Sequence, residues 1–340
     1  MTHALTVDLL TLLGAAVIAA VLIVLLRPLL QRYALARPNA RSSHRVPTPQ
    51  GGGIAVMAAA TSAVAAAGLL APHGFAEPWR LAAVFIAASA LALVGATDDI
   101  RPLEAWPRLL LQGVAVAVVI AVLPAGLRVI PMLPWWVERA LMALAVLWLV
   151  NLVNFMDGID WITVVEVVPI TAALAIFGWR GALPPEATAM ALALCGALIG
   201  FAPFNRPVAK LFLGDVGSLP IGLLLGWLLI LLAEHHLAAA LLLPLYYVAD
   251  ATITLLRRLV RGERVTQAHR SHFYQQAVDG GHGVYPVVAR IFVVNIALAV
   301  MAAATLHASP EIALLALAGG AALVAALLTA FSRAKASLSR

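Results

Sequence analysis

The stretch "ALMALAVLWLVNLVNFMDGID" (residues 140–160) joins an apolar run directly to a set of polar side chains. Its first half carries no charged group, and then amides and carboxylates recur every third residue, at Asn151, Asn154, Asp157 and Asp160. Residues three apart are neighbours on a helix surface, so these side chains form a band along one side. An apolar helix that ends in such a band predicts a membrane span whose end carries the chemistry.

The whole chain has the composition of an integral membrane protein. Of its 340 residues, 63% are hydrophobic and 11% are charged, against roughly half and a quarter in soluble proteins. Apolar segments of about 17 to 25 residues are long enough to cross a bilayer as helices. We therefore predict one all-α, polytopic membrane domain over residues 1–340. Its expected spans, eleven with ten as the alternative count, are 7–26, 53–71, 81–97, 108–124, 136–152, 162–178, 187–203, 217–233, 237–256, 286–306 and 310–330.

The basic residues indicate how these spans are oriented. Lys and Arg accumulate on the cytoplasmic side of membrane proteins. When the loops are assigned to alternate sides, one side receives most of them and the other carries Arg80, Arg128, Arg139 and Arg180. We expect the N-terminus outside and the C-terminus in the cytoplasm. The net charge of +6 then indicates the lipid bilayer and an anionic substrate as partners, and not nucleic acid.

Five polar stretches fall on the cytoplasmic side in this orientation. They are "RSSHRVPTPQGGG" (41–53), "GATDDIRP" (95–102), "NLVNFMDGID" (151–160), "FNRPVAKLFLGDVGS" (204–218) and "TQAHRSHFYQQ" (266–276). Acidic residues on the opposite side occur singly, whereas these stretches are clustered and flanked by glycine. Because ionisable groups near a membrane are costly, such a cluster indicates a functional site.

The adjacent pair Asp98 and Asp99 ends the third expected span. Neighbouring residues on a helix are about 100° apart, so the two carboxylates point to different partners. Close carboxylates repel unless they share a cation or a proton, which indicates a Mg²⁺ site or a general base. The alternative is a pair of solvated acids, although negative charge at a helix C-terminus opposes the helix dipole.

Asp215 stands between Gly214 and Gly217 where the eighth expected span begins. Glycine lets the backbone approach a ligand, and the amides of a helix N-terminus suit phosphate oxygens. An ordinary N-cap is the alternative role for this aspartate. Phe212, three residues earlier, is either a ring that stacks on a base or an aromatic residue of the membrane interface.

Two loops on the same side supply histidine and basic side chains. His269, Arg270 and His272 combine imidazole and guanidinium groups, which suit a phosphate. A basic, lipid-facing loop is the alternative, and a zinc site lacks a third ligand nearby. In the stretch 41–53, His44 and Thr48 belong either to a flexible substrate clamp or to a Gly-rich turn. Taken together, the inventory indicates metal-assisted chemistry on a phosphorylated substrate.

These motifs, in this order, resemble those of the polyprenyl-phosphate N-acetylhexosamine-1-phosphate transferases, the bacterial membrane enzymes of glycosyltransferase family 4. The resemblance covers nearly the whole chain, from "PTPQGGG" to "HRSH". It implies a multi-pass protein of the bacterial inner membrane with its active site on the cytoplasmic face. It also implies a Mg²⁺-dependent reaction, with Mn²⁺ as a substitute, between a UDP-N-acetylhexosamine and undecaprenyl phosphate. The products would be undecaprenyl-pyrophosphoryl-sugar and UMP, and a homodimer is compatible with this reading.

The resemblance assigns roles to the acidic residues. Asp98 and Asp99 resemble the paired aspartates beside the transferred phosphate. Asp157 and Asp160 resemble the acids on the nucleotide side, and we count all four as catalytic candidates. Asp215 resembles the Mg²⁺-binding aspartate, with Asp99 as a second metal candidate.

The resemblance also groups the residues expected to bind substrate. Asn154, Asn205, Lys210 and Phe212 fall in stretches that resemble the uridine-binding region, with Phe212 as the stacking ring. The histidine-rich loop of the family, which contacts the sugar-nucleotide phosphates, resembles the stretch with the catalytic candidates His269 and His272. The substrate-binding candidates are completed by His44, Thr48, Asn151 and Arg270.

Three positions depart from the family pattern. Pro102 stands where many relatives carry a third acid, Trp161 stands where glycine is usual, and the histidine loop reads H-R-S-H. This loop is more similar to the branch that starts O-antigen or other surface-polysaccharide synthesis than to the phospho-MurNAc-pentapeptide transferases, the alternative within the enzyme class. A transporter is the alternative of another class, but its polar residues belong near the bilayer midplane. Direct displacement by the lipid phosphate and a covalent aspartyl-phosphate both remain open.

Overall fold

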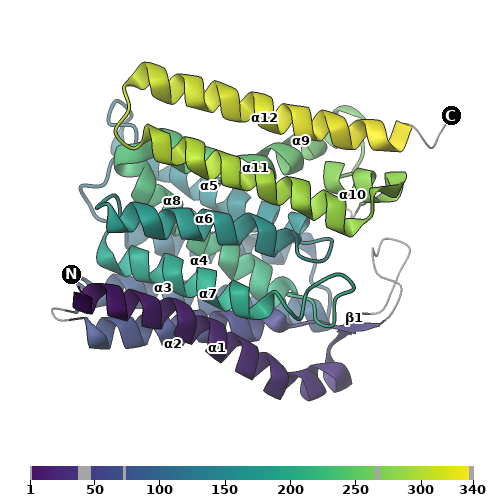
Figure 1. Cartoon of the computed structure of the whole chain (residues 1–340), viewed down its shortest axis with the longest axis horizontal. Coiled ribbons are helices and arrows are strands. Elements are labelled where there is room, and N and C mark those ends of the chain that lie inside the picture. Colours follow the sequence, from purple (N-terminus) through teal and green to yellow (C-terminus); the bar gives the residue numbers. More distant parts are fainter. Residues whose placement is uncertain (1, 37–46, 72–73, 265–268, 337–340) are drawn as a thin grey trace.

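The computed structural model describes residues 2–36, 47–71, 74–264 and 269–336, and this part of the chain is almost entirely helical (Figure 1). Proline stands in the first turn of α3, α7 and α12, where its missing N–H costs nothing. The elements are α1 (Thr2–Tyr33), β1 (Leu35–Ala36), β2 (Thr48–Pro49), α2 (Gly52–Leu70), α3 (Pro78–Ile100), α4 (Ala105–Ala121), α5 (Trp135–Met156), α6 (Ile162–Trp179), α7 (Pro185–Phe201), α8 (Asp215–Leu242), α9 (Leu245–Val260), α10 (Phe273–Ala277), the π-helical turn η1 (Val278–His282), α11 (Val284–Thr305) and α12 (Pro310–Ala336).

Among the described residues, eight helices are long and apolar enough to cross a membrane. These are α1, α2, α3, α5, α6, α8, α11 and α12, and the shorter apolar helices α4 and α7 lie beside them. The expected all-α, polytopic membrane architecture is therefore confirmed. The number of spans and their orientation stay predictions.

The region expected to hold the eighth and ninth spans has a more complex geometry. The expected break between them falls at His236, whose φ/ψ is non-helical, so that α8 continues past it to Leu242. The following helix, α9, is 16 residues long and amphipathic. It buries Tyr246 and Asp250 on one side and exposes Leu259 on the other. Polar groups thus enter the bundle on α9, at a place where the sequence alone suggested only a span.

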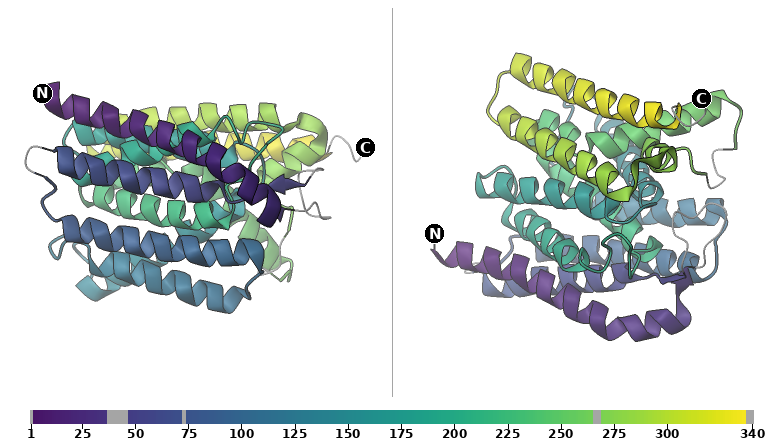
Figure 2. Two further views of the ribbon diagram at one scale, coloured as in Figure 1. Left: turned by 90° about the horizontal axis from the view of Figure 1, so that it is seen from below. Right: turned by 45° about the vertical axis from the view of Figure 1, so that its right-hand side comes forward.

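The long helices run alongside one another in both directions and form a single bundle (Figures 1 and 2). Helix α8 is the central element, since it packs against α2, α3, α5 and α11 and its apolar segment is fully buried. The start of α1 and the end of α12 lie at opposite ends of the bundle (Figure 1). We call the end at which α3 and α5 finish and α8 begins the aspartate end.

A small backbone ladder ties the loops of the aspartate end together. β1 pairs with β2 in antiparallel fashion, with Leu35 opposite Pro49. The ladder extends through Gln50, which forms a bridge with Phe212 in the loop before α8. The amides of Gly52 and Gly53 then donate to the carbonyls of Phe212 and Leu213, both at 2.9 Å. The "PTPQGGG" stretch is thus a Gly-rich turn. The amides at the start of α2, which have no partner within the helix, donate hydrogen bonds to the loop preceding Asp215.

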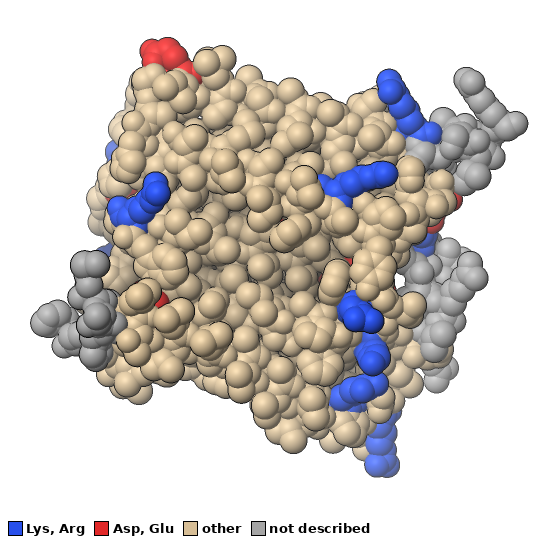
Figure 3. Space-filling model, viewed as in Figure 1, with Lys and Arg blue, Asp and Glu red and all other residues tan. Residues whose placement is uncertain are grey.

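Charged side chains are concentrated at the two ends of the bundle. On the face shown in Figure 3, a broad band without charges lies between them, and most Lys and Arg residues lie toward the end where β1 and α10 appear in Figure 1. An uncharged band of this kind is what a bilayer core requires of the surface it covers.

Two glycine contacts bring α8 close to its neighbours. A Cβ built on Gly53 would lie 2.2 Å from the Cα of Gly217, and one on Gly95 would lie 2.2 Å from the carbonyl oxygen of Asp215. Both contacts are to backbone, which cannot move aside cheaply. Gly217 therefore serves helix packing, whereas its position beside Asp215 had suggested the approach of a ligand.

Gly53→Ala tests this crossing. We expect the added methyl group to push α2 away from α8 and to cost about 1–3 kcal/mol, the usual range for overpacking. The measurement is the thermal midpoint and the monodisperse yield of the purified protein in detergent. Gly113→Ala is the matched control, because a Cβ there meets nothing within 4 Å. Equal stability of the two variants would contradict the close crossing.

Candidate active site

The aspartate end brings together residues that are more than a hundred positions apart in the chain. The end of α3 supplies Asp98 and Asp99, the end of α5 supplies Asn154, and the start of α8 supplies Asp215. The loop 269–272, which we call the histidine loop, and the short helix α10 lie at the same end (Figure 1). All five predicted polar stretches, two of them described only in part (47–53 and 269–276), therefore lie at one end of the bundle.

Asp99 holds the first turn of α8. Its Oδ1 accepts a hydrogen bond from the amide of Asp215 at 3.0 Å, and its Oδ2 accepts one from the amide of Val216 at 3.2 Å. A carboxylate at a helix N-terminus satisfies free amides and interacts favourably with the helix dipole. The capping role that was the alternative for Asp215 is thus taken by Asp99 from another helix, and the side chain of Asp215 is left for other contacts.

Asp98 and Asp215 share one cation. Arg108 Nη1 lies 2.7 Å from Asp98 Oδ2 and 3.8 Å from Asp215 Oδ2. The other oxygen of Asp98 accepts a hydrogen bond from the amide of Leu103 at 2.6 Å, and the Asp98 and Asp215 carboxyls are close enough to interact directly. Of the three acids in this cluster, two contact Arg108 and the third, Asp99, contacts the amides of α8. The cluster therefore has an excess of negative charge that favours a further cation.

The donor set of this cluster fits Mg²⁺. Among the described residues, no group of three His, Cys, Asp or Glu side chains forms a ready-made metal cage. Mg²⁺ is commonly held by one or two carboxylates together with substrate phosphates. The carboxyl of Asp215 matches that arrangement, whereas both oxygens of Asp99 accept amide hydrogen bonds and those of Asp98 bind an amide and a guanidinium.

The two asparagines of the opening motif have different surroundings. Asn154 Nδ2 donates to Asp215 Oδ1 at 2.7 Å and to Ser218 Oγ at 3.0 Å, so it belongs to the carboxylate cluster. Asn151, one turn earlier, donates to Gln112 Oε1 at 2.8 Å and joins α5 to α4. In this structure Asn151 is thus a contact between helices, and the band drifts away from the site toward the middle of the bundle.

Asp157 follows the last residue of α5 at the aspartate end. Its Oδ1 accepts a hydrogen bond from Thr163 Oγ1 at 2.5 Å. Burial raises the pKa of Asp157 to about 6. The hydrogen bond from Thr163 lowers this pKa, and the negative charges of Asp99 and Asp160 raise it. Asp160 points to the loop before α8, where its Oδ2 accepts the amide hydrogen of Ala209 at 3.0 Å.

Trp161 occupies the left-handed region, with φ of 66°. This conformation costs a non-glycine residue roughly 1–2 kcal/mol, which explains why glycine suits the position. The backbone here is held by Asn205, whose Oδ1 accepts the Trp161 amide at 2.8 Å and whose Nδ2 donates to the Leu211 carbonyl at 3.0 Å. The indole also donates to the Ala202 carbonyl at 2.7 Å. Asn205, predicted to bind substrate, thus organises the loop that carries Phe212.

The other substrate-binding candidates differ in exposure. The side chain of Lys210 is exposed and that of Phe212 is half-buried on the same loop. Thr48 is buried in β2. His44 lies outside the described residues.

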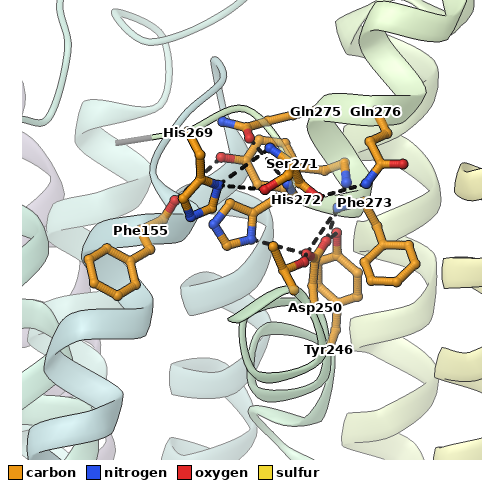
Figure 4. Close-up of polar contacts among 11 residues, drawn as sticks. Phe155, Tyr246, Asp250, His269, Ser271, His272, Phe273, Gln275 and Gln276 are labelled. Atoms are coloured by element: carbon orange, nitrogen blue, oxygen red, sulfur yellow. Dashed lines mark hydrogen bonds and ion pairs between the residues drawn. The ribbon is translucent and has the colours of Figure 1, made fainter. Parts of the chain in front are cut away.

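The histidine loop is organised by Asp250, a fully buried residue of α9 (Figure 4). Its carboxylate accepts the amides of Phe273 and Tyr274 at 3.1 and 3.3 Å and lies 3.2 Å from Nδ1 of His272. Tyr246 donates its hydroxyl to the same carboxylate at 3.2 Å. Asp250 thus caps α10 and sets the orientation of the His272 ring. Because Nδ1 faces Asp250, only Nε2 remains for another partner.

His269 and Arg270 complete this loop. His269 Nδ1 lies 2.8 Å from Ser271 Oγ, and its ring is 4.9 Å from that of His272. Burial, followed by the charges of His272 and Arg258, lowers the pKa of His269 to about 4. It is therefore a neutral imidazole near pH 7. Arg270 pairs with Asp279 at 2.6 Å.

Tyr274 connects the histidine loop to the segment that follows α5. Its hydroxyl donates to the carbonyl of Phe155 at 3.4 Å. A Cβ on Gly158 would lie 2.2 Å from that hydroxyl oxygen, so only glycine fits there. Asp157 and the histidine loop are thus fixed relative to each other.

Sequence reasoning missed two residues of this arrangement. Arg108 was counted only as evidence for orientation, and Asp250 was placed inside an expected span without comment. A signal existed for Asp250, because an acid within an apolar segment is a functional candidate by default. Arg108 had no such signal, since its neighbours in the chain are ordinary helix-start residues.

Comparison with known proteins shows which protein family this chain is similar to. The model of the family described as glycosyl transferase family 4 matches residues 81–233. A probable undecaprenyl-phosphate N-acetylglucosaminyl 1-phosphate transferase of Bacillus subtilis is 25% identical over 318 residues, which cover 87% of this chain and 86% of that protein. A decaprenyl-phosphate N-acetylglucosaminephosphotransferase of Mycolicibacterium smegmatis is 29% identical, covering 82% and 76%. A phospho-N-acetylmuramoyl-pentapeptide-transferase of Levilactobacillus brevis is 30% identical, covering 62% and 69%.

Asp157→Asn tests the electrostatics of the site through stability. Because the folded-state pKa of Asp157 is raised above its ordinary value, ionising it costs folding free energy. That cost grows as the pH rises from about 4 to 6 and is constant above. We expect Asp157→Asn, measured in EDTA, to have a higher melting temperature than the wild type at pH 7.5, with a gain in the free energy of unfolding of at most roughly 3 kcal/mol. At pH 4 the two proteins should have the same melting temperature.

Thr163→Val is the companion variant. The Thr163 hydrogen bond favours the ionised carboxylate, so its loss raises the pKa of Asp157 further, increases the cost of ionising it and moves the pH at which that cost levels off upward. Identical melting of Asp157→Asn and wild type at pH 7.5 would show that the carboxylate is not destabilised by burial.

Proposed function

Because this chain belongs to glycosyl transferase family 4, we propose that it transfers an N-acetylhexosamine 1-phosphate from a UDP-sugar to undecaprenyl phosphate. The products are undecaprenyl-pyrophosphoryl-sugar and UMP. The observation that carries the proposal is the carboxylate cluster of Asp98, Asp99 and Asp215, which lies at one end of a membrane bundle beside a loop with two histidines. We place the reaction at the first membrane step of O-antigen or another surface polysaccharide.

The choice between the two branches of the family rests on coverage and on the histidine loop. The relatives named as N-acetylglucosamine 1-phosphate transferases align with more than four-fifths of this chain, whereas the pentapeptide transferase aligns with 62%. The loop reads H-R-S-H. The pentapeptide transferase activity is the second candidate, because that relative has the highest identity of the three compared.

The orientation that we propose puts the aspartate end in the cytoplasm. The basic residues favour this direction. The start of α1 and the end of α12 lie at opposite ends of the bundle (Figure 1), which agrees with an odd number of crossings. The proposed location is the bacterial inner membrane, and a homodimer stays a prediction.

In the proposed reaction, an oxygen of the lipid phosphate attacks the β-phosphorus of the UDP-sugar. A new P–O bond forms to the lipid, the bond from the β-phosphorus to the oxygen bridging it to the α-phosphorus breaks, and UMP leaves with that oxygen. Arg108 would hold Asp98 in place and attract the anionic reactants. The second pKa of a phosphate lies near 6, so the nucleophile needs little help from a base.

The surroundings of the aspartates favour this direct route over a covalent aspartyl-phosphate. Both oxygens of Asp99 accept amide hydrogen bonds, and those of Asp98 bind an amide and a guanidinium. Carboxylates stabilised in this way are poor nucleophiles, because the attacking lone pairs are engaged. Trapping of a radiolabelled phospho-enzyme with UDP-sugar alone, in the absence of lipid, would overturn the direct route.

Mg²⁺ is the cofactor that we propose, with Mn²⁺ as a substitute. Asp215 would hold it next to Asp98, while Asp99 keeps the start of α8 in place. When bound, the ion neutralises charge on the pyrophosphate and on the leaving UMP. The neutral His269, whose Nδ1 accepts the amide hydrogen of Ser271, would keep its Nε2–H as a hydrogen-bond donor to phosphate, and Asp250 holds the ring of His272 beside it.

The decisive experiment is UMP release by the purified protein. The panel contains UDP-N-acetylglucosamine, UDP-N-acetylgalactosamine, a 6-deoxy analogue and UDP-MurNAc-pentapeptide, each with and without undecaprenyl phosphate. We expect lipid-dependent UMP release with one of the N-acetylhexosamine donors. Release with the pentapeptide donor alone would select the second candidate, and no release with any donor would refute both.

Substitutions in the cluster test the assigned roles. We expect Asp98→Asn and Asp215→Asn to lower turnover by at least a hundredfold at unchanged protein level, with added Mg²⁺ restoring Asp215→Asn only in part. Glu104→Gln, an exposed acid at the same end, is the control and should retain activity. Full activity in either aspartate variant would contradict the assignment.

A further inference from the structure

Arg139 of α5 is buried at the end of the bundle away from the aspartates. Its side chain is among the buried polar groups, at 6% exposure. Nη2 donates to the carbonyls of Pro124 and Leu127 at 2.7 and 3.2 Å. Within the described part of the chain, Nε and Nη1 are shielded and have no hydrogen-bond partner. A guanidinium has five N–H donors, so three of them are left unsatisfied at a site where that is costly.

The neighbouring acid does not supply the missing partner. Glu138 is ion-paired with Arg128 and also accepts the amides of Val129 and Ile130, the latter at 2.7 Å. Its carboxylate is therefore occupied by the loop that precedes α5. The unsatisfied donors of Arg139 need an acceptor from outside this group.

A cavity of about 380 Å³ adjoins Arg139. Its walls are small apolar side chains of two helices, with Ala117, Ile120 and Ala121 on α4 and Ala140 and Ala143 on α5. Three of these alanines, at 117, 121 and 140, are exposed, so the cavity opens at the side of the bundle. An apolar slot that ends at a cation is complementary to an amphiphile, because the slot suits an acyl chain and the cation suits an anionic head.

The aromatic residues beside Arg139 indicate its depth in the membrane. Trp135 and Trp136 begin α5 and are 54% and 70% exposed. Tryptophan is enriched at the boundary between lipid headgroups and hydrocarbon. The Arg139 guanidinium lies 5.4 Å from the centre of the Trp135 ring, one turn further inside. This is the level of the first carbons of the acyl chains, directly below the headgroup phosphates.

We propose that this slot is a binding site for an anionic glycerophospholipid of the surrounding bilayer. Its phosphate accepts hydrogen bonds from Nε and Nη1 of Arg139, and an acyl chain lies along the alanines between α4 and α5. The site is distinct from the carboxylate cluster, because roughly 22 Å of helix separates Arg139 from Asn154 at 1.5 Å per residue. In the orientation proposed above, it faces the outer leaflet.

The experiment compares wild type with Arg139→Met in delipidated detergent solution. Phosphatidylglycerol, phosphatidylcholine and inorganic phosphate are added separately, and the melting temperature and lipid retention by native mass spectrometry are measured. We expect phosphatidylglycerol to raise the melting temperature of the wild type by several degrees more than phosphatidylcholine does. Arg139→Met should bind phosphatidylglycerol at least tenfold more weakly. Arg180→Met, which changes an exposed arginine at the same end, should behave as wild type.

A second variant keeps the arginine and fills the slot. Ala143→Phe places a ring where the acyl chain would lie, and we expect it to lose phosphatidylglycerol retention even if Arg139→Met fails to fold. Retention equal to wild type in Ala143→Phe would overturn the proposal. Equal stabilisation of the wild type by inorganic phosphate and by phosphatidylglycerol would also overturn it, because no acyl chain would then be needed.

Discussion

The hydrogen bonds from the first turn of α8 to the carboxylate of Asp99 position the rest of the site. They join the end of α3 to the start of α8 through two backbone amides. Because α8 is the central helix of the bundle, fixing its first turn also fixes Asp215 against Asp98 and Asn154. The glycines at 53, 95 and 217 make this geometry possible, since any side chain there would meet backbone of the neighbouring helix.

The cluster that results is electrostatically unbalanced. Asp98 and Asp215 contact Arg108, Asp99 is the third acid of the cluster, and the charge of Asp99 acts on Asp157. Such an arrangement is costly to folding, and the cation proposed above would offset part of that cost. Clustered acids of this kind are common where a protein stores unfavourable electrostatics for function.

The histidine loop is positioned by a different principle. Here a buried acid on an amphipathic helix, Asp250, satisfies the amides of α10 and holds His272. Tyr274 then links the loop to the backbone after α5. Two separate polar networks, one based on a helix start and one on a buried carboxylate, are thus tied to the end of α5, the first through Asn154 and the second through the carbonyl of Phe155.

The sequence by itself determined the membrane class, the helical architecture and the motifs that meet at one end, because apolar length and the alternation of spans leave few other choices. It also singled out Asp98, Asp99, Asp157 and Asp215. Only the tertiary structure decided which contacts they make: Asp99 caps α8, Asn205 supports the strained Trp161, Asn151 joins helices, and Arg108 and Asp250 enter the site. These roles depend on the rotation and distance of helices from distant parts of the chain, and local spacing carries no information about either.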